Sequence, residues 1–129
     1  DAGLIYNTFP LMDGMIFPEG IMDISPWYLN FFENVITVQF DHRLLAILSA
    51  VFTVFVWFQL RERLLLKEQR IPLNCLLIVV LLQVSLGIAS LISIVPIWLG
   101  LLHQSGAVIL FGLSIWLVFT LSQDVQTDI

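Results

Sequence analysis

The sequence predicts an all-α integral membrane fold with three transmembrane helices. Hydrophobic residues make up 59% of the 129 residues and charged residues only 12%, and the mean hydropathy is +0.97. Water-soluble domains carry about a quarter charged residues, so this composition is typical of a membrane protein. A membrane-spanning helix needs roughly 20 mostly apolar residues, and three segments meet that requirement, at about 35–60, 72–95 and 98–121.

The first expected helix, 35–60, follows a segment (1–34) that has five acidic residues and no Lys or Arg. Asn34 is a suitable N-cap for this helix. The positive-inside rule places segment 1–34 on the outer face of the membrane. Just before the helix stands an aromatic group, which is either an interfacial belt or a lid over an outer site: Trp27, Tyr28, Phe31 and Phe32.

The second and third helices follow from the distribution of charge and proline. Four of the five basic residues lie between Arg61 and Arg70, so the first connection is expected on the inner face. Pro72 suits the first turn of the second helix, where its missing N–H has no intrahelical acceptor. A short outer connection at 94–97 then leads to the third helix, and the tail, 122–129, ends on the inner face.

The same composition limits the classes of partner. No basic face exists outside the inner connection, so nucleic acid is not an expected partner, whereas the lipid bilayer is. The single Cys75 cannot form an intrachain disulfide, and a packing role is expected for it. Because the chain begins at Asp1 without a signal peptide, we expect it to be a part of a longer protein.

The only two histidines, His42 and His103, lie near the starts of the first and third helices. Both of these helices are predicted to start at the outer face. At 1.5 Å per residue the histidines therefore lie about 11 Å and about 8 Å into their helices. A polar imidazole at this depth is costly without a partner, so the spacing predicts one shared ligand.

Two imidazoles without a nearby thiolate or carboxylate favour haem over zinc, because zinc usually takes three or four protein ligands and haem takes two axial ones. Arg43 either pairs with a haem propionate or extends to the interface. Small or polar residues on the faces below the histidines indicate a cavity or, equally, close helix packing: Ala46, Ser49, Thr53, Gln83, Gly87, Ser90, Ala107 and Ser114.

Five motifs occur in this order along the chain: DAGLIYNTFPLM (1–12), FEN (32–34), VQFDHR (38–43), QVSLGI (83–88) and HQSG (103–106). Together they resemble the C-terminal half of haem A synthase in its mitochondrial and alphaproteobacterial form, from Asp1 to about Leu121. The resemblance implies eight transmembrane helices in two four-helix halves, of which this chain supplies three helices of one incomplete haem-binding bundle.

The resemblance also implies an activity and a cofactor. The family oxidises a methyl group of haem O to a formyl group, which yields haem A for cytochrome c oxidase. The C-terminal half holds haem b, and the other half takes haem O. No catalytic residue is expected in this half, and the expected cofactor site has His42 and His103 as axial iron ligands with four further members: Gln39, Arg43, Gln83 and Gly87.

One position departs from the family's other half, which has a glutamate three residues before the His-Arg histidine. Here that residue is Gln39, which cannot accept a proton at neutral pH. This favours a cofactor site over a site of oxidation. The alternatives are an electron-transfer subunit of cytochrome b type and a transporter or structural protein whose histidines bridge helices. Expected partners are haem O synthase, cytochrome c oxidase assembly factors and a second copy of the chain, in a bacterial plasma membrane or mitochondrial inner membrane.

Overall fold

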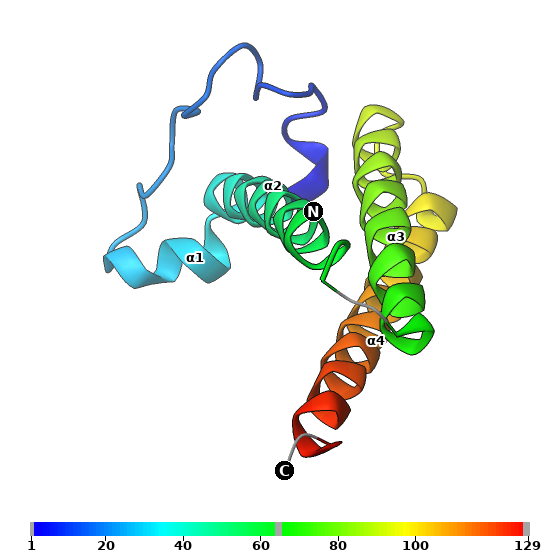
Figure 1. Ribbon diagram of the computed structural model, residues 1–129. Coiled ribbons are helices and arrows are strands. Elements are labelled where there is room, and N and C mark those ends of the chain that lie inside the picture. The colour runs from blue at the N-terminus through cyan, green and yellow to red at the C-terminus, as the bar shows by residue number, and fades with distance from the viewer. Residues whose placement is uncertain (1, 64–65, 128–129) are drawn as a thin grey trace.

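The chain folds into helices, and no strand occurs in residues 2–63 and 66–127, which the computed structural model describes. Figure 1 shows the three long helices: α2 (Val35–Leu60), α3 (Lys67–Ile92) and α4 (Ile97–Thr127). Two 3-10 turns, Ala2–Leu4 and Trp27–Leu29, and a short α1 (Asn30–Glu33) precede them. All three long helices are long and apolar enough to cross a membrane, so the predicted fold class is confirmed.

The bounds of α2 match the prediction, and so does its N-cap. The side-chain oxygen of Asn34 accepts hydrogen bonds from the main-chain N–H groups of Ile36 (3.0 Å) and Thr37 (3.2 Å). Its amide also donates to the Gly20 carbonyl (2.8 Å) and to Asn30, whose side chain is fully buried. Asn34 therefore both starts the helix and fastens the outer segment to it.

We expect Asn34→Ala to lower the free energy of unfolding of the full-length protein by about 1–2 kcal/mol, because an N-cap and its associated bonds are lost. Denaturant-induced unfolding in detergent micelles measures this change. Glu33→Ala is the matched control, since Glu33 is an exposed neighbour in α1. Equal stability of the two variants would contradict the capping role.

The prediction for α3 was wrong at both ends. The helix starts five residues early, at Lys67, so Pro72 lies inside it rather than in its first turn. Glu68 supplies an acidic side chain to the true first turn, where it interacts favourably with the helix dipole. Pro72 tolerates this place because its fixed φ is already helical, although its ring leaves the Glu68 carbonyl without an intrahelical donor.

The outer end of α3 is set by a Schellman motif, which ends the helix three residues before the predicted position. The Val95 N–H donates to the Ser90 carbonyl (2.8 Å) and the Ile94 N–H to the Leu91 carbonyl (3.1 Å). Ile94 adopts a left-handed φ of 60°, at the position that usually carries glycine. No glycine marked this end in the sequence, which is why hydropathy alone extended the helix too far.

The third helix begins one residue earlier than predicted and continues six residues beyond Leu121. Residues 122–127 were expected to form an inner tail, and they extend α4 instead. Residues 128 and 129 lie outside the described part. The polar sequence after Leu121 has no proline or glycine to stop a helix, so the helix runs past the apolar stretch.

The helices pack together near the C-terminal ends of α2 and α4 and the N-terminal end of α3. α3 lies antiparallel beside α4 (Figure 1) and packs less extensively on α2. The buried cluster consists of Leu73, Leu76 and Leu117. Partly buried side chains from α2 and α4 surround it: Val56, Trp57, Leu60, Leu110, Leu113 and Leu121. The apolar core therefore stabilises this end of the three helices, and their opposite end depends on other contacts.

Candidate functional site

His42 and His103 lie together at the outer ends of α2 and α4. Their ring centroids are 6.1 Å apart, and the ring planes meet at 74°. α4 begins at Ile97, so His103 lies six residues, or about 9 Å, into its helix, close to the roughly 11 Å of His42 in α2. The packing of α2, α3 and α4 has thus brought together two imidazoles that are 61 positions apart in the sequence (103 − 42).

Neither imidazole makes a hydrogen bond within the described residues. His103 is half-buried, and its Nδ1 is buried without a hydrogen-bond partner. His42 is exposed, and its ring lies beside the His103 ring. The described residues contain no group of three or more His, Cys, Asp or Glu that could hold a metal ion. The arrangement therefore brings the imidazoles of two different helices side by side.

Two residues of the predicted site, Gln83 and Gly87, lie on α3 near His103. A Cβ added to Gly87 would lie 3.0 Å from His103 Cε1, so the ring rests directly against the α3 main chain. The side-chain amide of Gln83, one turn before, donates to the His103 carbonyl (2.5 Å). Gln83 and Gly87 thus contact the main chain and the ring of the same histidine.

Gln39 and Arg43 were predicted to face the cofactor, and the structure gives them other partners. Both hold the segment from Tyr6 to Leu11. The Gln39 amide donates to the Tyr6 carbonyl (2.9 Å) and accepts from the Tyr6 N–H (3.2 Å). Arg43 donates to the carbonyls of Tyr6 (2.7 Å), Thr8 (2.9 Å) and Leu11 (3.5 Å).

The outer segment runs beside the second and third turns of α2, and its main chain is irregular there. Its carbonyl groups therefore need hydrogen-bond donors. Irregular main chain at membrane depth is tolerated only when its polar groups have partners. Gln39 and Arg43 provide donors to three carbonyls there. The same loop carbonyls accept hydrogen bonds from the Arg43 guanidinium, which would be costly in lipid without such partners.

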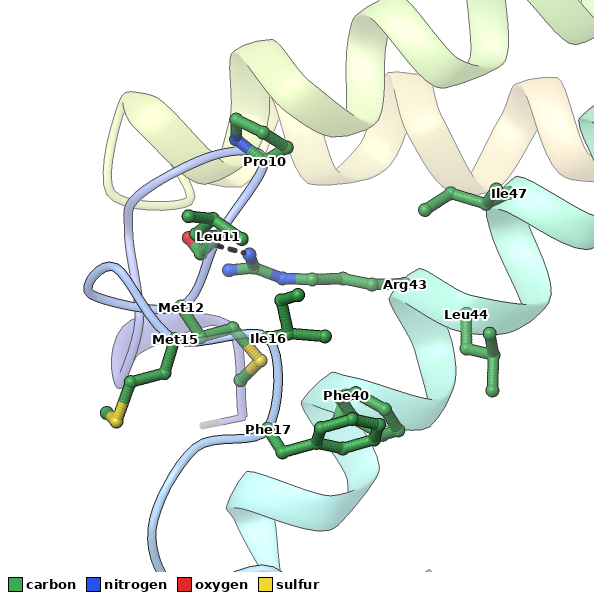
Figure 2. A pocket seen from close by; sticks show the side chains of 10 residues that line it. All are labelled: Pro10, Leu11, Met12, Met15, Ile16, Phe17, Phe40, Arg43, Leu44 and Ile47. Carbon is green, nitrogen blue, oxygen red and sulfur yellow. Dashed lines mark hydrogen bonds between the residues drawn. The ribbon is translucent and has the colours of Figure 1, made fainter.

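The face of α2 that carries Arg43 also forms the wall of an apolar pocket of about 240 Å³ (Figure 2). Loop residues from Pro10 to Phe17 cover it, and Arg43 extends over it toward the Leu11 carbonyl. The helix contributes residues with i, i+3, i+4, i+7 spacing: Phe40, Arg43, Leu44 and Ile47. His42 lies roughly 150° around the helix from this row, so the pocket and the histidine pair are separate features.

The small-residue stripe gives a mixed result. On α3, Gly87 contacts His103 and Ser90 is buried, as close packing requires. On α2, Ala46 and Ser49 are exposed within this chain, and Thr53 bonds back to the Ser49 carbonyl (2.9 Å). The aromatic residues before α2 are exposed as well, with Phe32 at 82% and Trp27 at 65%. Their roles as a belt or a lid remain predictions.

Comparison with known proteins gives one family. Residues 1–115 match a family model described as cytochrome oxidase assembly protein. A heme A synthase of Nitrosospira multiformis is 45% identical over 115 residues, which are 89% of this chain and 32% of that protein. A Wolbachia pipientis heme A synthase is 47% identical over 113 residues, 87% of this chain and 32% of its own length.

A mammalian protein is similar as well. The heme A synthase COX15 of Bos taurus is 41% identical over 118 residues, which are 92% of this chain and 29% of that protein. The chain therefore spans about a third of the length of the curated relatives it matches. No solved structure matches it.

Proposed function

The chain belongs to the cytochrome oxidase assembly protein family, whose relatives are heme A synthases, and from this we propose that it is the haem b-holding part of a haem A synthase. The longer protein would oxidise a methyl group of haem O to a formyl group. Membership of this oxidoreductase family and three helices able to span a membrane agree with a multi-pass protein of the bacterial or mitochondrial inner membrane.

The separation of the two imidazoles is the observation that carries the proposal. A bond between a first-row metal ion and an imidazole nitrogen is about 2 Å long, and the ring centre lies roughly 1 Å behind that nitrogen. Two imidazoles that held one iron between them would therefore have ring centres roughly 6 Å apart. The distance between the centroids of His42 and His103 is 6.1 Å, so the pair fits a bis-histidine haem.

His42 and His103 would hold the two axial positions, and Gly87 would keep one side of the His103 ring free of side chains. A haem with both axial positions filled supplies one-electron transfer. Gln39 leaves this half without a carboxylate at the position where the family's other half has one, so we place the oxidation of haem O outside the described residues. A propionate bond from Arg43 is a further proposal, for which its buried and unpartnered Nε is a free donor.

We propose haem O as the substrate of the longer protein. Haem O synthase and cytochrome c oxidase assembly factors are its proposed partners, and self-association is a further proposal. The chemistry of a hydrophobic substrate made and used in the membrane supports direct transfer between membrane proteins. The domain division into an outer segment (1–34), a membrane region (35–121) and an inner tail (122–129) is part of the same proposal, with the tail continuing α4 as a helix.

A reduced-minus-oxidised absorption spectrum of the purified full-length protein tests the cofactor. We expect a b-type spectrum with the low-spin signature of two histidine ligands. A protein purified from haem-replete cells without any haem would contradict the proposal. Formation of haem A from haem O in membranes that lack another synthase tests the enzyme, and haem b binding without haem A formation would identify an electron-transfer subunit instead.

A further inference from the structure

His103 is the better positioned of the two proposed ligands, and α3 is the reason. A Cβ added to Gly87 would approach three atoms of the His103 ring: Cε1 at 3.0 Å, Nδ1 at 3.5 Å and Nε2 at 3.8 Å. With no side chain at position 87, the imidazole can reach the α3 main chain. His42 is exposed, and its ring pairs with the ring of His103.

The buried Nδ1 of His103 has no hydrogen-bond partner of standard geometry. A buried N–H group without an acceptor is unfavourable, so an acceptor close to this atom matters. The main-chain carbonyl of Gln83 lies one turn before Gly87, and a Cβ added to Gly87 would be 3.5 Å from His103 Nδ1. In an α-helix this carbonyl points toward residue 87, so the missing side chain of Gly87 is what exposes it. A carbonyl oxygen has two lone pairs and can accept a second hydrogen bond.

A second contact fixes the height of His103 against α3. The Gln83 side-chain amide donates to the His103 carbonyl at 2.5 Å. The amide oxygen, Oε1, lies against Gly106, one turn further along α4, where any Cβ would overlap it. Gln83 therefore reaches α4 only because position 106 also lacks a side chain. Two glycines and one glutamine together set the register between α3 and α4 at the histidine.

We propose that Gln83 and Gly87 are positioning residues for His103, which rests on the proposed haem site. In this arrangement the Gln83 main-chain carbonyl accepts the proton on His103 Nδ1, and the Nε2 lone pair is left for iron. A histidine that binds a metal through one nitrogen commonly donates its other N–H to a carbonyl or carboxylate, which fixes the tautomer and increases the basicity of the ligand.

The first test is the tautomer of the haem-free protein. Imidazole ¹⁵N chemical shifts of the full-length wild type, assigned with a His103→Ala variant, distinguish the two neutral forms. We expect the proton on Nδ1 of His103. A proton on Nε2 would overturn the proposal, and this measurement does not depend on whether the protein binds haem.

The second test uses Gly87→Ala in the full-length protein. The added methyl group pushes the ring away from the α3 main chain, so we expect about a 10-fold loss of haem b affinity and a higher reduction potential, because a less basic ligand stabilises ferric iron less. Gly112→Ala is the matched control on α4, since a Cβ there would have nothing within 4 Å. Unchanged affinity and potential in Gly87→Ala would overturn the proposal.

A third variant separates the role of the Gln83 side chain from that of the Gln83 main-chain carbonyl. Gln83→Leu removes the side-chain bond to the His103 carbonyl and keeps the main-chain carbonyl, so we expect weaker haem binding with the wild-type potential. A raised potential in Gln83→Leu without one in Gly87→Ala would mean that the side-chain oxygen is the acceptor, which would contradict the main-chain assignment. A wild-type protein without haem b would refute the proposed function and leave the tautomer result to stand by itself.

Discussion

Replacing His42 or His103 with alanine in the full-length protein is expected to remove haem b almost completely. Each variant would leave the proposed haem only one histidine, and no substitute is available, because the chain contains no third histidine and the described residues contain no cluster of metal ligands. The haem content of the purified protein, measured by the pyridine haemochrome spectrum, should fall at least 10-fold.

Ser105→Ala is the matched control for the histidine variants. Ser105 lies two residues from His103, is exposed, and bonds only to the Leu101 carbonyl of its own helix (2.8 Å). Its replacement should leave the haem content unchanged. If both histidine variants retained wild-type haem b, the ligand assignment would fail even though the two rings lie close together.

Arg43→Ala is expected to release the outer segment from α2. The substitution removes the donors to the carbonyls of Tyr6, Thr8 and Leu11. Hydrogen bonds from charged groups contribute about 1.5–3 kcal/mol each. Hydrogen exchange followed by mass spectrometry should show residues 6–13 opening more easily by roughly 2–4 kcal/mol of local free energy. Arg43→Lys should recover only part of the loss, because an ammonium cannot reproduce the guanidinium fork.

Two further variants test whether the effect of Arg43→Ala comes from its bonds to the outer segment. Gln39→Ala should open the same segment, because Gln39 binds both main-chain groups of Tyr6. Arg61→Ala should not, because Arg61 lies at the inner end of α2 beside Trp57 and Glu62. If Arg43→Ala removed haem b as fully as the histidine variants and left exchange in residues 6–13 unchanged, a propionate bond would be the main role of Arg43.

The sequence predicted well what depends on a single helix. Apolar length placed α2 at its observed bounds, and the preference of Asn for the N-cap identified Asn34. The ends of α3 and α4 were less accurate, because they depend on features that hydropathy does not record. Ile94 ends α3 in a left-handed conformation that isoleucine rarely adopts, and Pro72 lies within a helix that begins before it.

The site divides in the same way. The sequence by itself determined the membrane class, the family motifs and the similar depth of His42 and His103, because hydropathy and the rise per residue act along one chain. Only the tertiary structure decided that Gly87 and Gln83 contact His103, and that Gln39 and Arg43 turn to the outer segment. The rotation of each helix and the path of an irregular loop are set by packing and hydrogen bonds between residues far apart in sequence, which no local pattern encodes.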